Sequence, residues 1–194
     1  YKRQVFICAL LNAQPMGFYS PSQLVAGARR SGIAVRPADV SHSDWDSTLE
    51  PDAGNRDGRH ALRLGLRLVK GFAAGEGERI AASRQPSDHG TPYTGLADIM
   101  RRADVSARAL EAIAKADGFT SLGLDRRQAL WQVRALAGQR LQELPLFAHA
   151  TRRHDDLAGT EPDVTLPKAH QGEEVAADYR SLGLSLKDHP VRLL

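Results

Sequence analysis

The stretches LVKGFAAGE at residues 68–76 and IAKADGF at residues 113–119 decide the fold of this chain. In each, an apolar helical segment runs into a tight turn that contains glycine, and a second helical pattern follows. This order is typical of a helix-hairpin-helix motif. Small hairpin residues let the backbone approach a ligand closely, and amides at the start of the next helix face a phosphate. The sequence therefore predicts two hairpins in tandem.

Basic side chains flank both hairpins and supply charge for contacts with phosphate. Contacts of this kind hold a nucleic-acid backbone without reading bases, so binding would be independent of sequence and sensitive to salt. The residues predicted to contact DNA are Lys70, Gly71, Arg79, Arg84, Lys115, Gly118, Arg126 and Arg127.

The alternative is that both turns are ordinary glycine caps between helices. In the second turn, Asp117 would repel a phosphate. That residue favours a structural role for the second hairpin, with Arg126 and Arg127 contacting DNA from the helix that follows.

Charge is distributed unevenly around these hairpins. The 194 residues carry 26 Lys and Arg against 23 Asp and Glu, for a net charge of +3. Residues 59–84 and 101–140 each have a net charge of +4, whereas residues 41–58 carry −4 and residues 141–178 carry −5. The small total therefore hides two basic blocks separated and followed by acidic connectors, and local fields matter more to a polyanion than the total does. Arg outnumbers Lys by 21 to 5, which suits phosphate binding, although a GC-rich genome is an alternative cause of the same bias.

Composition excludes several classes of protein. With 42% apolar and 25% charged residues the chain is globular rather than disordered. No run of about 18 apolar residues exists to span a membrane. Cys8 is the single cysteine, so an internal disulfide framework and a cysteine zinc cluster are excluded, in agreement with a cytoplasmic location. The seven histidines lack metal-ligand spacing, so no metal site is predicted. There is no signal peptide or initiator Met, and we expect a piece of a longer protein.

The remaining pattern predicts a mainly α fold with a small β-hairpin. Ser20 and Pro21 are typical of a helix start, and Gly32 of a helix end. A strand near Thr48 is expected to pair with residues 60–64, across turn residues. Expected helices span about 2–13, 21–31, 76–83, 95–103, 106–116, 125–137 and 173–182. Residues 33–37 are expected to form a short strand or an extended link, and residues 138–170 to be poorly ordered.

Several side chains outside the hairpins have structural interpretations. We expect Trp131 to lie in the core rather than to stack on bases, and Cys8 to act as a small core hydrophobe. Trp45 and Tyr93 are candidates for lining a domain seam. The acidic pair at residues 44 and 46 is expected to be solvated or capping rather than metal-binding.

An apolar tetrad stands out in the polar stretch after the basic blocks. It is similar to the short motif with which polymerases and their partners dock on a sliding clamp, and an extended segment with few anchors tethers effectively although it binds weakly. The alternative is a tail segment that packs on its own domain. The candidate clamp-binding residues are Gln142, Leu144, Leu146 and Phe147.

Six blocks in this order carry a resemblance to a known family. The chain resembles part of the error-prone bacterial C-family DNA polymerase (the ImuC-type alpha subunit), and the resemblance covers essentially the whole chain. The blocks are ALLNAQPMGFYSPSQLVAGARRSGIAVRPADV (9–40), HSDWDSTLE (42–50), RLGLRLVKGF (63–72), ADGFTSLGLDRRQALWQVRAL (116–136), LPLF (144–147) and DYRSLGLSLKDHP (178–190).

The resemblance implies a domain organisation. Residues 1–36 would end a fingers domain, residues 37–137 would form a tandem helix-hairpin-helix domain that grips duplex DNA, and residues 138–194 would lead as a flexible linker toward an absent OB-fold. The catalytic palm and its Mg²⁺ would lie upstream, so no cofactor and no catalytic residue is expected in this chain.

The resemblance also implies a function and partners. The chain would position duplex or primer–template DNA for damage-induced mutagenic synthesis, with the sliding clamp and other mutasome proteins as further partners and no contact with a membrane. Replicative relatives usually have Gly-Val-Gly at the first hairpin, whereas this chain has Gly71-Phe72-Ala73, which implies a weaker grip on phosphate. The alternatives are a protein-interaction module and the helix-hairpin-helix module of a repair nuclease.

Overall fold

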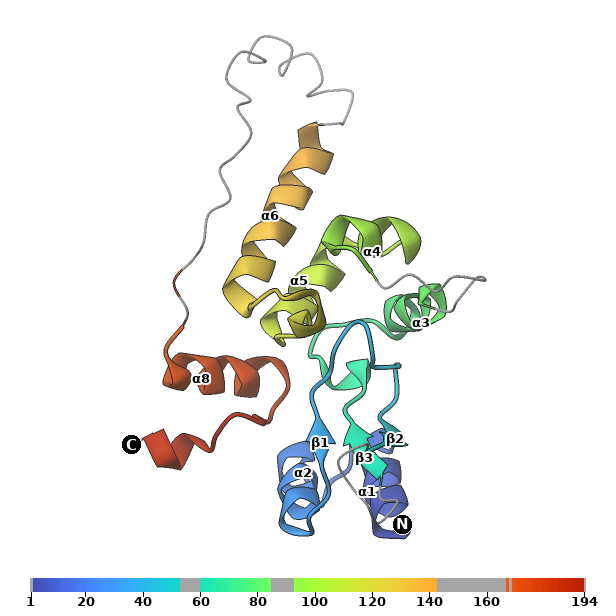
Figure 1. The fold of residues 1–194 in the computed structure, drawn as a ribbon, viewed down its shortest axis with the longest axis vertical. Helices are drawn as coiled ribbons and strands as arrows, with labels where there is room; N and C mark the ends of the chain where they lie inside the picture. Colours follow the sequence, from blue (N-terminus) through green and yellow to red (C-terminus); the bar gives the residue numbers. More distant parts are fainter. Residues whose placement is uncertain (1, 53–59, 85–92, 143–166, 168, 194) are drawn as a thin grey trace.

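The computed structural model describes residues 2–52, 60–84, 93–142, 167 and 169–193, with the backbone alone at 139–142 and 193. The fold is mainly helical with one small sheet, as predicted (Figure 1). The elements are α1 (Lys2–Asn12), α2 (Pro21–Arg30), β1 (Val35–Arg36), β2 (Thr48–Pro51), β3 (His60–Arg63), η1 (Leu66–Leu68), α3 (Ala74–Ser83), α4 (Leu96–Arg102), α5 (Ala107–Lys115), η2 (Thr120–Leu122), α6 (Arg126–Gln142), α8 (Gln171–Ser181) and η4 (Pro190–Leu193).

The two N-terminal helices have different sequence signals. Ser20 caps α2 in a capping box with Gln23, and Gly32 follows the helix at a φ of +72°, so both predicted ends are confirmed. The apolar residues at 5, 6 and 8–10 predict that α1 is mostly buried, and this prediction was wrong. Only Gln4, Ile7 and Leu11 are buried, one side chain per turn, and the aromatic ring of Phe6 is 62% exposed.

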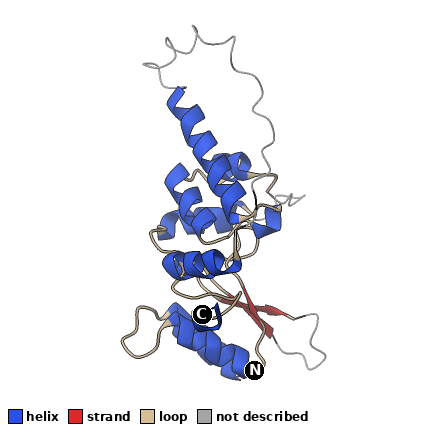
Figure 2. Cartoon of the chain, turned by 90° about the vertical axis from the view of Figure 1, so that its left-hand side faces the viewer, coloured by secondary structure: helices blue, strands red, loops and turns tan. Residues whose placement is uncertain are grey.

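The sheet has three strands in the order β1-β3-β2. The predicted hairpin is confirmed, because β2 pairs antiparallel with β3 and Leu49 lies opposite Leu62. The extended segment at Val35 forms a third strand, parallel to β3. In Figure 2 the strands lie between the N-terminal helices and the helices that follow the sheet.

One continuous apolar core runs from Ile7 in α1 to Leu184 after α8. The expectation that Trp131 lies in this core was wrong: its ring is 50% exposed on α6. Trp45 packs against Phe72 with ring centroids 6.1 Å apart. The Tyr93 hydroxyl is buried and donates to the Ile80 carbonyl at 2.7 Å.

The C-terminal part differs from the expected boundaries. Helix α6 continues to Gln142 rather than ending near residue 137, so the start of the stretch expected to be poorly ordered is helical. Most of residues 138–170 lies outside the described residues. Figure 1 shows α8 beside the body of the molecule, below the start of α6.

A buried carboxylate ties the segment after β1 to the turn before α6. The Asp39 carboxylate accepts hydrogen bonds from the amides of Ser41 and Ser121 and from the Thr120 hydroxyl, at 2.8–3.1 Å. It also lies 3.0 Å from His42 Nδ1. Burial alone would raise the pKa of Asp39, but the hydrogen bonds from Ser121, His42 and Ser41 outweigh it and lower the pKa.

Replacing Asp39 with asparagine is expected to lower the free energy of unfolding at neutral pH by about 1–3 kcal/mol, because buried donors lose a charged acceptor. The folded-state pKa of Asp39 is below the ordinary 3.8. The stabilisation is therefore present above pH 3.8 and is lost as the pH falls through the lower folded pKa. Urea unfolding of both proteins across this range should show the difference narrowing in acid, and a difference that stays constant would contradict the prediction.

Candidate nucleic-acid interface

The first hairpin connects η1 to α3. Gly71 has a φ of +76°, which favours glycine, and a Cβ built there would meet open space. Ala73 precedes α3 in an extended conformation and provides no side-chain cap. The first amides of a helix have no intrahelical acceptor, so the start of α3 keeps donors for an external anion.

Phe72 anchors this hairpin to the rest of the molecule. Its side chain is 8% exposed and packs against the Trp45 ring and against Gly77, which lies close to both rings. A Cβ at Gly77 would be 2.6 Å from the Trp45 ring and 3.2 Å from the Phe72 ring. The large residue at this position therefore fills space in the core.

A second turn with the same plan lies between α4 and α5. Asp104 has a φ of 48°, and Ser106 then caps α5 by accepting from the Ala109 amide at 3.1 Å. Arg79 of α3 donates to the carbonyls of Ala103 and Asp104, both at 3.0 Å.

These contacts hold the starts of α3 and α5 together. The Ser106 amide donates to Glu76 Oε1 at 2.9 Å, which adds a second link between the two helix starts. Two basic side chains flank the turn: Arg101 has a side chain 80% exposed and Arg108 is exposed. Sequence reasoning predicted the first hairpin but missed its partner turn between α4 and α5, although the Ser106 cap after a polar break marked a helix start.

The turn at residues 116–119 lies inside the molecule, whereas sequence reasoning placed Gly118 on a phosphate-binding surface. Its amide donates to the Ile113 carbonyl and its carbonyl accepts from the Val40 amide. A Cβ there would be 2.7 Å from the Ile113 side chain. Asp117 binds Lys187 Nζ at 2.8 Å. This turn therefore contacts protein on both sides.

Arg126 is also internal. Its guanidinium donates to the Lys115 carbonyl and to the carboxylates of Asp178 and Glu174, and the side chain is 7% exposed. It joins the end of α5 and the start of α6 to α8. In the sequence, the feature that could have indicated this buried ion-pair role is the pair of acids Glu174 and Asp178, which lie one helical turn apart.

Opposite charges hold the C-terminal segment against this cluster. Burial would raise the pKa of Glu174, but Lys187 and Arg126 lower it below the ordinary value. Burial would likewise lower the pKa of Lys187, but Asp117 and Glu174 raise it. Glu174 and Lys187 therefore stay charged at neutral pH, and the ion pairs that they make fix α8 against the turn before α6.

The other predicted cations are spread over the surface. Arg84 pairs with Asp44 at 2.6 Å and Lys115 pairs with Glu111 at 2.9 Å. Arg127 pairs with Glu173 at 2.8 Å. Arg79 lies on α3 and Arg84 directly follows this helix, while Lys115 and Arg127 lie toward α8.

Lys70 belongs to the group near α8. Its ammonium donates to the Tyr179 carbonyl at 3.1 Å and its amide to the Ser181 carbonyl at 2.9 Å. The structure brings Lys70, Lys115 and Arg126 together around a cavity of about 410 Å³, where Arg180 of α8 joins them. We call this cavity the α5–α8 cavity. Sequence reasoning missed Arg180.

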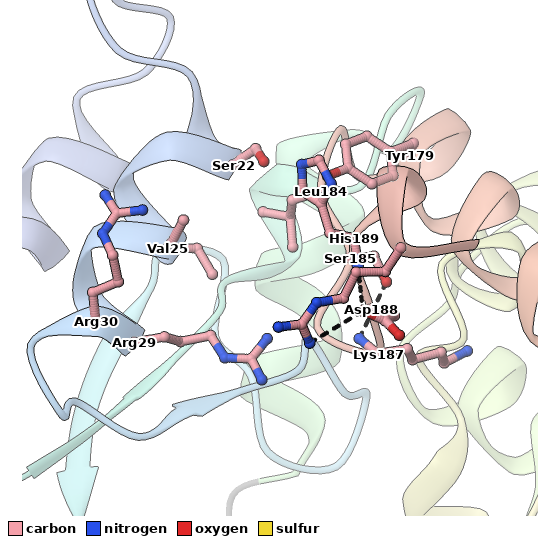
Figure 3. A pocket seen from close by; sticks show the side chains of 12 residues that line it. Ser22, Val25, Arg29, Arg30, Tyr179, Leu184, Ser185, Lys187, Asp188 and His189 are labelled. Carbon is pink, nitrogen blue, oxygen red and sulfur yellow. Dashed lines mark hydrogen bonds and ion pairs between the residues drawn. The ribbon is translucent and has the colours of Figure 1, made fainter. Parts of the chain in front are cut away.

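A different basic cavity of about 280 Å³ lies between α2 and the C-terminal segment (Figure 3). Its lining includes Arg29 and Arg30 from α2 and Lys187 and Asp188 from the C-terminal segment, and Arg29 extends toward that segment. Arg29 donates to the Leu186 carbonyl at 3.1 Å. A carboxylate among the cations reduces the positive potential of this cavity.

Some predictions fall outside the described residues. Leu144, Leu146 and Phe147 are among them, and of Gln142 only the helical backbone is described, so the clamp-binding segment stays a sequence-based prediction. Within the described residues, no three His, Cys, Asp or Glu side chains are grouped to hold a metal ion. No helix in that part of the chain is long and apolar enough to cross a membrane.

Comparison with known proteins matches both the motif and the whole chain. The helix-hairpin-helix motif family matches residues 32–129. An error-prone DNA polymerase of Ruegeria pomeroyi is 48% identical over 98% of this chain, and one of Sinorhizobium medicae is 46% identical over all of it. The error-prone DNA polymerase 1 of Rhizobium meliloti is 45% identical over the full chain. The chain spans 16–18% of the length of these relatives.

Proposed function

Because the chain belongs to the helix-hairpin-helix motif family, and matches error-prone DNA polymerases over nearly its whole length, we propose that it binds the backbone of duplex DNA as a segment of such a polymerase. The observation that carries this proposal is the pairing of two helix starts. Arg79 and Glu76 of α3 both bind the turn that precedes α5.

Two helix starts that are linked in this way can each bind phosphate groups of a DNA backbone. Each start presents amide donors and the positive end of a helix dipole. Arg101 and Arg108 flank the α5 start with exposed side chains, and Arg79 binds the turn before it. Lys70 and Gly71 lie at the turn before α3. Contacts of these types position a duplex without reading its sequence.

The eight residues predicted from the sequence then divide by role. Lys70, Gly71 and Arg79 belong to the proposed backbone contact, and the exposed parts of Lys115 and Arg127 extend it toward α8. The other three support it, because Gly118 and Arg126 are internal and Arg84 is held by Asp44 at 15% exposure.

The same proposal places the chain within a larger activity. The whole protein would extend primers opposite damaged templates, and its Mg²⁺-dependent catalytic step would belong to residues outside this chain. This segment would hold the primer–template duplex while that step occurs.

Placing a carboxylate at the start of α3, by Ala74→Glu, is expected to weaken duplex binding about tenfold, equivalent to about 1.4 kcal/mol. An acid in the first helical turn favours the helix itself, so the loss would come from repulsion of phosphate. Fluorescence anisotropy with a labelled duplex measures the affinity. The matched control is Ala82→Glu, which adds the same charge at the other end of α3, where the residue is also exposed.

Salt dependence and sequence dependence complete this test. The logarithm of affinity should fall linearly with the logarithm of salt concentration, and two duplexes of unrelated sequence should bind equally. Equal losses in both glutamate variants, or no binding of the parent protein at low salt, would contradict the proposal and favour a protein-interaction module.

A further inference from the structure

Glu76 places a carboxylate between the starts of α3 and α5. It is half-buried and is the acidic residue in the first turn of α3. Its Oε1 atom accepts a hydrogen bond from the amide of Ser106, the residue that caps α5, at 2.9 Å. One side chain therefore brings a negative charge to both helix starts.

The amides around this carboxylate suit an anion. At the start of α3, the amides of Ala74 and Gly75 have no hydrogen-bond acceptor among the described residues. The same holds for the amides of Ala107 and Arg108 at the start of α5. Such amides, together with the positive end of the helix dipole, attract negative charge. Glu76 is therefore a built-in anion beside donors that an external anion would also use.

No cation neutralises this carboxylate within the part of the chain that the structure describes. Arg79 lies one helical turn further along α3, but its guanidinium donates to the carbonyls of Ala103 and Asp104. The Ser106 amide is the partner of Glu76 in that part of the chain. Because like charges repel, an unpaired carboxylate here opposes a phosphate that approaches the neighbouring amides.

The local geometry separates the hydrogen bond of Glu76 from its charge. In a capping box, the third residue of the helix is Glu or Gln and accepts from the amide of the capping residue. The third residue of α5 is Ala109, whose amide donates to the Ser106 hydroxyl at 3.1 Å but whose side chain has no acceptor. Glu76 supplies the missing acceptor from α3. An uncharged amide oxygen would serve equally, so the cap itself does not require the negative charge.

We propose that the charge of Glu76 limits the affinity of the two helix starts for duplex DNA. The side chain holds α5 beside α3 through its hydrogen bond, and its charge repels phosphate from the same place. This inference rests on the proposed function and adds to it a residue that sets the strength of binding. If Glu76 only caps α5, its charge has no specific effect on binding.

Glu76→Gln in the full 194-residue chain tests the proposal, because glutamine keeps an acceptor for the Ser106 amide and removes the charge. We expect this variant to bind a labelled duplex about fivefold more tightly than the parent protein, equivalent to about 1 kcal/mol. The matched control is Glu78→Gln, which removes the same charge from an exposed side chain on the same helix. The control should change the affinity by less than about twofold, because an exposed charge away from the contact is screened by salt.

Two further comparisons show whether the gain comes from the charge. Glu76→Asp keeps the negative charge but shortens the side chain, so it should bind the duplex no more tightly than the parent protein. The gain for Glu76→Gln should shrink when the salt concentration is raised from about 50 mM to about 150 mM. Fluorescence anisotropy measures all four proteins.

Several results would overturn the proposal: no gain for Glu76→Gln, an equal gain for Glu78→Gln, a gain for Glu76→Asp, or a gain that salt does not reduce. In each of these cases the parent protein still binds the duplex, so the proposed function stands without this inference. Absence of duplex binding by both the parent protein and Glu76→Gln at low salt would overturn the two together.

Discussion

Replacing Arg126 with alanine is expected to lower the free energy of unfolding by about 3–5 kcal/mol. The side chain is 7% exposed, and its partner Asp178 is 6% exposed. Removing the guanidinium leaves the Asp178 carboxylate buried without its main cation, and it also frees the Lys115 carbonyl. The cost is large because the remaining charge has no access to water.

Urea unfolding followed by circular dichroism measures this loss. Arg127→Ala is the matched control, because the neighbouring arginine is 40% exposed and pairs with an exposed Glu173. Exposed pairs contribute about 0–1 kcal/mol, so the control should unfold close to the parent protein. A loss of the same size in both variants would show that Arg126 does not hold α8 in place.

Replacing Gly65 with alanine is expected to cost about 3 kcal/mol, at the upper end of the usual range for overpacking. A Cβ at this position would be 2.4–2.5 Å from backbone atoms of Trp45, Asp46 and Ser47. Backbone cannot move aside as a flexible side chain can. The Gly65 amide also donates to the Ser47 hydroxyl at 3.1 Å. Moving residues 45–47 away from the new methyl group would therefore also break this hydrogen bond.

Thermal unfolding compares this variant with Gly27→Ala. Gly27 lies within α2, and nothing comes within 4 Å of a Cβ built there. Alanine in a helix interior is about 0.5–1 kcal/mol more favourable than glycine, so the two substitutions should have opposite signs. A midpoint for the Gly65 variant equal to that of the parent protein would contradict the close approach between Gly65 and residues 45–47.

Local signals were sufficient for most elements of the fold. The Ser20 cap, the Ser106 cap and the Asp125 cap at the start of α6 depend on contacts within three residues, and each forms as the sequence predicts. The pairing of β2 with β3 follows from alternation across a turn. The sequence predicts a short strand or an extended link at 33–37 but not its pairing, because Leu62, the partner of Val35, is 27 positions away in the chain.

Predictions for single side chains were less successful. Trp131 follows helical spacing with apolar neighbours, yet α6 has partners on only part of its circumference and the ring faces outward. Arg126 and Arg127 are adjacent in the sequence and identical in type. The first is buried in an ion-pair cluster with α8 and the second lies at the surface. Their difference depends on where residues 173–178 pack.

The sequence by itself determined that the chain is mainly helical, where its helices begin, and that glycine turns alternate with basic helices, since these features depend on neighbouring residues. Tertiary structure alone decided which turns lie at the surface. Residues 38–40 and Lys187 cover the turn at Gly118. By contrast, the hydrogen bond from Arg79 to the Ala103 carbonyl holds the α4–α5 turn next to α3, which follows the first hairpin. It also placed Lys70, Lys115, Arg126 and Arg180 around one cavity. Such groupings arise from contacts between residues tens of positions apart, which no local pattern encodes.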